Sequence, residues 1–175
     1  RIIKVPSNVN HKLLAGNFLR GLTAAALLFH VIKPEKGMKI LVHSAAGGLG
    51  TILTKWAARL GMEVFATVSS DEKAQIAKAN GARHVINYKS DDFVFKTLEI
   101  TNGNGVDYII DGVGGDNLHN SFKAVKPFGI VANIGQIKPV LPINITEITN
   151  IFVSRPSILT LINDVDIYKS LAEKY

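Results

Sequence analysis

The chain of 175 residues contains no cysteine, and this absence excludes disulfides and thiolate metal sites. It is compatible with a reducing compartment, and we expect a cytoplasmic location. Histidine could still bind a metal, but the histidines fall in no spacing typical of metal ligands. They are His11, His30, His43, His84 and His119. The sequence therefore predicts that no metal is bound, catalytic zinc included.

Long apolar runs and several catalytic signatures are also missing. No stretch of eighteen apolar residues occurs, so the sequence predicts no membrane-spanning helix. There is no G-x-S-x-G nucleophile elbow and no Walker lysine after the glycines. The N-terminus has neither an initiator methionine nor a signal-peptide pattern, and we expect the chain to be part of a longer protein.

Acidic residues are outnumbered by basic ones, 14 to 20, which gives a formal net charge of +6. The basic residues are scattered and form no block, and no nucleic-acid recognition motif accompanies them. A small phosphate-bearing ligand is a sufficient target for this mild positive field. The sequence thus predicts partners that are small molecules, with no nucleic acid and no membrane.

Apolar runs of strand length alternate with segments of helical spacing, which predicts parallel βαβ units. Because these units follow one another, we expect an α/β fold with a doubly wound, Rossmann-type parallel sheet of about six strands. Residues 1–175 would form a single dinucleotide-binding domain. The expected strands are 39–43, 63–68, 84–88, 106–111, 130–134 and 151–153. The expected helices are 51–60, 69–80, 91–100, 117–125 and 164–175, preceded by helices over 11–32 that Gly16 and Gly21 interrupt.

The turn after the first strand is rich in glycine, in the segment Val42-His43-Ser44-Ala45-Ala46-Gly47-Gly48-Leu49-Gly50. Ala45, Gly47 and Gly50 take the three small-residue positions of the G-x-G-x-x-G fingerprint, the first as alanine. Such a turn lets a pyrophosphate approach backbone N–H groups at a helix N-terminus. The strand–turn–helix setting predicts a dinucleotide site, although a tight turn of another α/β protein would have the same pattern.

The end of the second strand carries serines where an acidic residue commonly holds the ribose 2′-hydroxyl. Ser69 or Ser70 occupies this place, with Lys73 one turn further on. Hydroxyls and a cation suit a 2′-phosphate, which favours NADP over NAD. The alternative is that Ser69 and Glu72 form a capping box and Lys73 is a solvated helix lysine.

Several segments occur together in an order that resembles a known family. They are Gly21-Leu22-Thr23-Ala24, the glycine turn, Val85-Ile86-Asn87-Tyr88, Gly105-Val106-Asp107 and Ser154-Arg155-Pro156. The chain resembles the cofactor domain of the zinc-independent medium-chain dehydrogenases/reductases, in their NADPH:quinone oxidoreductase (zeta-crystallin-like) branch. The resemblance implies NADPH as cofactor and hydride transfer to a quinone or enone.

The resemblance also implies roles for particular residues. The backbone of Ala46, Gly47, Gly48 and Leu49 would hold the pyrophosphate, and Ser69, Lys73 and Tyr88 would surround the 2′-phosphate. Gly112 to Gly114 would pass the adenine side, while Thr23 and the segment from Ile134 to Gln136 would lie near the nicotinamide. Tyr88 could instead be a plain strand-end aromatic, and Thr23 could bond to its own helix backbone.

No catalytic residue is identified, because much of the substrate pocket would belong to a GroES-like domain that is mostly missing here. We therefore expect the isolated fragment to bind NADPH but to be inactive. The resemblance further implies a homodimer through the edge strand at 151–155, whose Ile151-Phe152-Val153 run carries no charge. The alternatives are an S-adenosylmethionine-binding methyltransferase domain and a non-catalytic dinucleotide-binding module.

Overall fold

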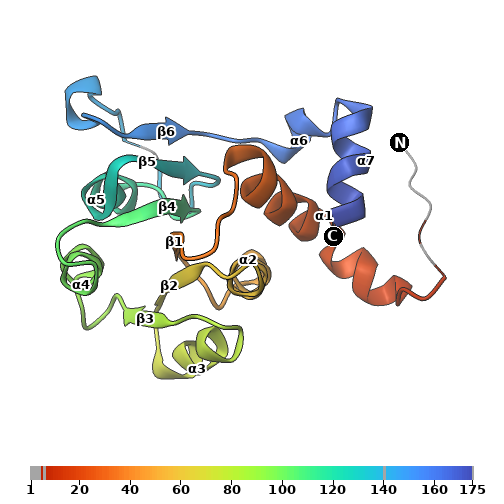
Figure 1. The fold of residues 1–175 in the computed structure, drawn as a ribbon, viewed down its shortest axis with the longest axis horizontal. Coiled ribbons are helices and arrows are strands. Elements are labelled where there is room, and N and C mark those ends of the chain that lie inside the picture. Colours follow the sequence, from red (N-terminus) through yellow and green to blue (C-terminus); the bar gives the residue numbers. More distant parts are fainter. Residues whose placement is uncertain (1–4, 6, 140, 175) are drawn as a thin grey trace. The chain divides into compact units, whose positions relative to one another are not determined.

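The computed structural model describes residues 5, 7–139 and 141–174, which form two compact units. One unit is the continuous segment Pro34–Pro156, and the other joins the residues up to Lys33 with those from Ser157 onward. The sheet and its covering helices lie wholly within Pro34–Pro156 (Figure 1). That the whole of 1–175 acts as one dinucleotide-binding domain stays a prediction.

The continuous unit is built on six strands in the order β3-β2-β1-β4-β5-β6, with all neighbours parallel. This is the strand order of the Rossmann fold, so the predicted fold class is confirmed. The strands are β1 (Lys39–Val42), β2 (Glu63–Val68), β3 (His84–Asn87), β4 (Val106–Asp111), β5 (Val125–Asn133) and β6 (Phe152–Ser154).

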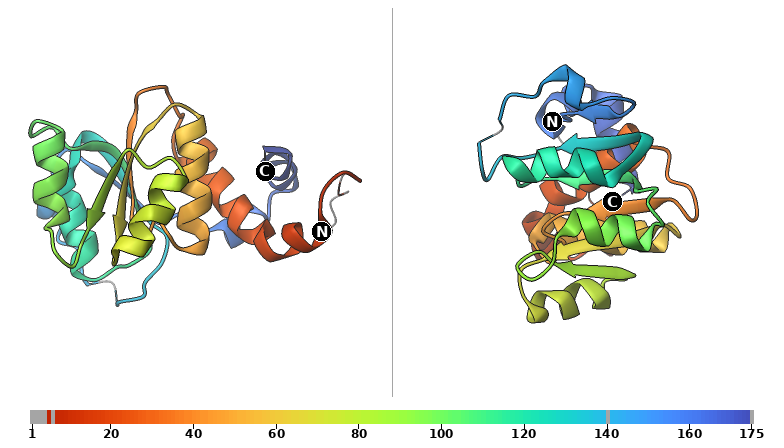
Figure 2. Two further views of the ribbon diagram at one scale, coloured as in Figure 1. Left: turned by 90° about the horizontal axis from the view of Figure 1, so that it is seen from below. Right: turned by 90° about the vertical axis from the view of Figure 1, so that its left-hand side faces the viewer.

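Both faces of the sheet are covered by helices, and its central strands are therefore apolar on both sides. Helices α4 (Phe93–Ile100) and α5 (Asp116–Ala124) pack together on one face. Helices α2 (Gly48–Arg59) and α3 (Asp71–Ala79) cover the other (Figures 1 and 2). Ile40, Leu41 and Val42 of β1 are fully buried between these layers.

Strand β5 is longer than the sequence predicts. Pro127 and Gly129 suggest a turn before a strand at 130, yet the strand begins at Val125. Val125 pairs with Val106, and the ladder shifts register before Tyr108 pairs with Ile130. The extra residues form an irregularity within the strand, in which Phe128 has a φ of 61°.

The second unit contains α1 (His11–Ala26), the π-helical turn Leu27–Val31, α6 (Ile158–Leu161) and α7 (Val165–Lys174). The prediction that Gly16 and Gly21 interrupt the first helix is wrong, because α1 runs through both. The rings of Phe18 and Tyr168 meet edge to face with centroids 6.5 Å apart, which joins α1 to α7.

Among the described residues, one helix, His11–Val31, is long and apolar enough to cross a membrane by length and composition. Its mean hydropathy of 1.3 is also typical of a core helix, and 39% of the apolar window is buried within the protein. Arg20 lies in the middle of this helix. The finding is therefore weak evidence for a membrane span.

Candidate cofactor site

The candidate site lies at the carboxyl ends of the strands, where the strand order reverses between β1 and β4. In open α/β sheets ligands bind in the crevice at this point. The turn between β1 and α2 forms one side of it, and the loops after β4 and β5 form the other.

The turn after β1 is held by its own backbone. The N–H of Gly47 donates to the carbonyl of Ser44 at 2.8 Å, and Ser44 has a left-handed φ of 54°. A Cβ on Gly50 would lie 2.3 Å from that carbonyl oxygen and 2.7 Å from the Cα of Ala45. Only glycine permits this close packing of helix on turn, as the fingerprint predicts.

Helix α2 begins at this turn without a side-chain cap and without an acidic residue in its first turn. Gly47 is its N-cap, and Gly48 and Leu49 are its first two residues. The N–H groups of a first helical turn have no acceptor within the helix, and together with the positive end of the helix dipole they suit a phosphate.

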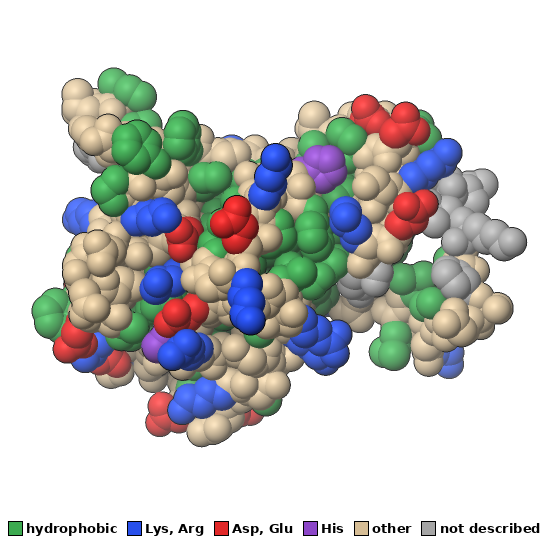
Figure 3. All heavy atoms as spheres, in the orientation of Figure 1, with side chains coloured by type: hydrophobic (Ala, Val, Ile, Leu, Met, Phe, Trp, Pro, Cys, Tyr) green, Lys and Arg blue, Asp and Glu red, His purple; other side chains and the backbone are tan. Residues whose placement is uncertain are grey.

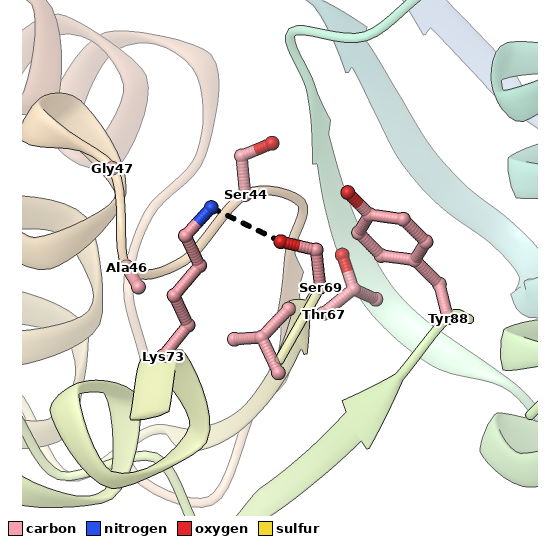
Figure 4. A pocket seen from close by; sticks show the side chains of 8 residues that line it. Ser44, Ala46, Gly47, Thr67, Ser69, Lys73 and Tyr88 are labelled. Carbon is pink, nitrogen blue, oxygen red and sulfur yellow. Dashed lines mark hydrogen bonds between the residues drawn. The ribbon is translucent and has the colours of Figure 1, made fainter. Parts of the chain in front are cut away.

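Next to the helix N-terminus is a pocket of about 110 Å³ (Figure 4). It brings together residues from the turn, from β2, from α3 and from the end of β3. They are Ser44, Ala46, Gly47, Thr67, Val68, Ser69, Lys73 and Tyr88. Five of the predicted cofactor residues thus meet in one place.

The polar end of the pocket is made by Lys73 and Ser69, whose side chains are directed at one another (Figure 4). The Nζ of Lys73 donates to the Oγ of Ser69 at 3.0 Å. No carboxylate is among the residues that line the pocket. This arrangement gives the pocket a positive end that is suited to a phosphate group.

The capping interpretation of Ser69 is wrong in its residue. Ser70 is the N-cap of α3 and accepts from the backbone N–H of Lys73 at 3.3 Å. Asp71 and Glu72 occupy the first turn of α3, where acidic residues complement the helix dipole. Because Ser70 caps the helix, the hydroxyl of Ser69 is left for the pocket.

Tyr88 follows β3 and is 51% exposed. Its backbone N–H donates to the carbonyl of Val68 at 3.0 Å, which fixes the start of its side chain beside the end of β2. A half-exposed aromatic ring at the rim of a pocket offers a flat apolar face to a ligand.

The loops after β4 and β5 touch one another and contain the other predicted residues of this unit. A Cβ on Gly114, where φ is +75°, would lie 2.6 Å from the carbonyl oxygen of Lys138. A Cβ on Gly112 would lie 3.7 Å from Cγ1 of Ile134. Gly112, Gly114, Ile134 and Gln136 therefore belong to one pair of adjoining loops.

Asp111 closes β4 and shapes the first of these loops. It is fully buried, and its Oδ1 accepts from the N–H groups of Val113 at 2.6 Å and Gly114 at 3.1 Å. Its Oδ2 is buried without a hydrogen-bond partner within the part of the chain that the structure describes. The carboxylate thus sets the conformation of the loop at the strand end.

His43 lies buried at the end of β1 in a network that the sequence did not reveal. Its Nδ1 is 2.9 Å from Oγ1 of Thr67, and its Nε2 is 3.1 Å from Oγ of Ser121. The Ser121 hydroxyl donates to the carbonyl of Asn117, so it accepts from Nε2–H, and Thr67 donates to Nδ1. Burial lowers the pKa of His43 to about 4, against a smaller opposing effect of Asp111.

Thr23 belongs to the other unit, on α1, and its Oγ1 donates to the carbonyl of Leu19 at 2.7 Å. This is the backbone hydrogen bond that the alternative interpretation expected. A nicotinamide contact for Thr23 stays a prediction.

No group of three or more His, Cys, Asp or Glu within the described ranges 5, 7–139 and 141–174 could hold a metal ion. That the protein works without zinc stays a prediction.

The chain belongs to the zinc-binding dehydrogenase family, whose model matches residues 48–166. Its relatives identify the branch. The chain is 40% identical over 167 residues to a 2-haloacrylate reductase of Burkholderia sp, an alignment that covers 90% of this chain and 50% of the relative. The resemblance to medium-chain dehydrogenases/reductases of the quinone oxidoreductase branch is confirmed.

Solved structures of quinone oxidoreductases have the same fold. The enzyme of Pseudomonas syringae pv. Tomato DC3000 matches with a TM-score of 0.94 and 34% identity, over 98% of this chain and 54% of that one. The Escherichia coli enzyme, complexed with NADPH, matches with a TM-score of 0.92 and 31% identity, over the same shares of the two chains. The chain spans about half the length of these reductases and quinone oxidoreductases.

Proposed function

We propose that this chain is the NADP(H)-binding part of an oxidoreductase that reduces a quinone or an enone by hydride transfer. The observation that carries the proposal is the pocket in which Lys73 and Ser69 form a positive end without any lining carboxylate. An NAD site would place an acidic residue here for the ribose hydroxyl, and that residue would repel a 2′-phosphate.

Each part of the cofactor has a matching part of the site. The pyrophosphate would lie on the backbone of Ala46, Gly47, Gly48 and Leu49. A Cβ at Gly47 would reduce the space that the phosphates have next to this backbone. The 2′-phosphate would accept hydrogen bonds from Lys73 and Ser69, with Tyr88 beside the adenosine. The loops of Gly112, Gly114, Ile134 and Gln136 would receive the rest of the molecule, with Ile134 and Gln136 at the nicotinamide.

The bound nicotinamide would supply the hydride, so this part of the protein needs to orient the ring rather than to donate or accept a proton. The relative named 2-haloacrylate reductase supports a substrate with an activated carbon–carbon double bond. The relatives named quinone oxidoreductase support a quinone.

A homodimer through β6 is part of the proposal. Strand β6 itself carries no charge and presents Phe152, which is 59% exposed, at the edge of the sheet, and Arg155 follows directly after the strand. Charged residues protect an edge from pairing, and an apolar edge invites it. A two-fold axis would pair β6 with its own copy antiparallel.

A cytoplasmic location and the absence of nucleic-acid and membrane partners complete the proposal. On the face in Figure 3, Lys and Arg side chains are dispersed among acidic and apolar ones rather than gathered in a basic surface. Nucleic-acid binding would require such a gathered surface.

Titration of the chain with NADPH, NADH and S-adenosylmethionine tests the proposal. Cofactor fluorescence should show saturable binding of NADPH and much weaker binding of NADH. Adenosine 2′,5′-bisphosphate should displace the NADPH. Binding of S-adenosylmethionine with no response to NADPH would instead support the methyltransferase alternative, which Ser69 at the end of β2 does not favour.

A further inference from the structure

Arg155 follows β6 and bonds to two positions on the neighbouring strand and loop. Its Nη1 donates to Oδ1 of Asn133, the last residue of β5. Its Nη2 donates to Oε1 of Gln136 at 3.2 Å, in the loop that follows β5. The planar fork of arginine can hold two acceptors in a fixed relation, which a lysine ammonium cannot do.

Asn133 transmits this contact to the end of β4. It is 3% exposed, and its Nδ2 donates to the carbonyls of Gly135 at 2.9 Å and Asp111 at 3.4 Å. The Asp111 carbonyl also accepts from the N–H of Ile134 at 2.7 Å. Because Oδ1 of Asn133 accepts from Arg155 and Nδ2 donates to the two carbonyls, both ends of this buried amide are hydrogen-bonded and its orientation is fixed.

The two loops joined in this way are closely packed along their backbones. A Cβ on Gly135 would lie 3.0 Å from the carbonyl oxygen of Gly112, and the N–H of Lys138 donates to the carbonyl of Val113 at 2.8 Å. The loop after β5 is therefore held on one side by its hydrogen bond with Arg155 and on the other side by its backbone contacts with the loop after β4.

We infer that Arg155 is a positioning residue for the nicotinamide half of the cofactor. It would hold Ile134 to Gln136 in the conformation that receives the ring, without itself touching the reacting atoms. This inference rests on the proposed NADP(H) function. The arginine is exposed at the edge of the sheet, but its removal takes one donor from the Oδ1 of the buried Asn133 and should therefore also lower stability.

The test separates the two halves of the cofactor. Affinities for NADPH and for adenosine 2′,5′-bisphosphate, which lacks the nicotinamide half, are measured for wild type, Arg155→Met and Arg155→Lys. Both variants should bind NADPH about tenfold more weakly than wild type, which is the loss expected for a charge-assisted hydrogen bond. Their affinity for the bisphosphate should stay within about twofold of wild type. Arg83→Met is the matched control, since Arg83 is an exposed arginine beside β3, and it should change neither affinity.

Hydrogen exchange in the absence of ligand gives a second readout. In both Arg155 variants the N–H groups of Ile134 and Lys138 should exchange about tenfold faster, while those of α2 keep their rates. Unchanged exchange, equal weakening of both ligands or full rescue by Arg155→Lys would each overturn the inference. If wild type binds neither ligand, the proposed function fails and the role at the nicotinamide fails with it. Faster exchange would then show only that Arg155 orders the loop.

Discussion

At the scale of single residues, Lys73 decides between two dinucleotides. Its ammonium group donates a hydrogen bond to the Ser69 hydroxyl in the pocket. A charged 2′-phosphate would interact with this cation far more strongly than an uncharged ribose 2′-hydroxyl would. Lys73→Ala should weaken NADPH binding by about 1–3 kcal/mol and leave NADH almost unchanged. Titration of both cofactors against wild type measures the difference.

Lys78→Ala is the control for this change, because Lys78 lies in the last turn of the same helix and outside the pocket. It should leave both affinities unchanged. Equal losses of NADPH and NADH in Lys73→Ala would contradict a 2′-phosphate at this residue.

The buried His43 should make the stability of the folded chain depend on pH. Burial lowers its pKa from 6.5 to about 4, so the unfolded chain binds a proton between these values that the folded chain does not. Folding stability from this group is fully present above pH 6.5 and is lost as the pH falls toward about 4. The loss should approach about 3 kcal/mol.

Denaturant unfolding between pH 4 and 7 measures this dependence. His43→Gln removes the titrating group and should flatten the curve over that interval, although it lowers stability at neutral pH. His11→Gln, at an exposed position at the start of α1, should keep the wild-type slope. A wild-type curve that is already flat would show that His43 is protonated without unfolding.

At the scale of elements, Gly50 and Gly16 both lie in helices but differ in the space around them. A Cβ on Gly50 would collide with the backbone of Ser44 and Ala45, whereas a Cβ on Gly16 would meet nothing within 4 Å. Gly50→Ala should destabilise the chain by about 1–3 kcal/mol through overpacking. Gly16→Ala should stabilise it by about 0.5–1 kcal/mol through helix propensity. Thermal unfolding of both variants checks the signs, and a neutral Gly50→Ala would contradict the close packing.

The elements best predicted from the sequence are those whose signals are local. The turn at Gly47 and the strands beside it follow from glycine chemistry and hydrophobic pattern. That a serine, Ser69, comes directly after β2 is read from the sequence itself. The capping-box alternative names the wrong serine for α3, because Ser69 and Ser70 are adjacent and chemically alike. Only the backbone, in which Ser70 accepts from Lys73, distinguishes them.

Features made by residues distant in sequence were missed. His43 meets Thr67 and Ser121 through three separate elements, and no periodicity links them. The contact of Arg155 with Asn133 depends on the pairing of β6 with β5. The sequence predicts Val125 at the end of a helix over 117–125 and a strand only from 130, but the pairing of Val125 with Val106 of β4 makes it the first residue of β5.

At the scale of the whole molecule, the exposed edge of β6 predicts assembly. Phe152→Lys would place a charge on that edge and should shift a dimer to monomer. Phe95→Lys is the matched control, because Phe95 is similarly exposed at 63% but lies on helix α4. Sedimentation over a range of concentrations measures both. A wild type that remains monomeric at high concentration would contradict the dimer.

The division of the chain into a continuous and a discontinuous unit has a consequence for the order of folding. Helices α1 and α7 pack on one another, yet all of Pro34–Pro156 lies between them in sequence. Bringing them together in an unfolded chain closes a very long loop, and the entropic cost of closure grows with loop length. Once the sheet has formed, the chain between the two helices is already compact, so little further entropy is lost when α1 and α7 come together. We therefore expect the sheet to form first and the α1–α7 pair to dock last, so that this pair is also the first part to open under mild denaturant.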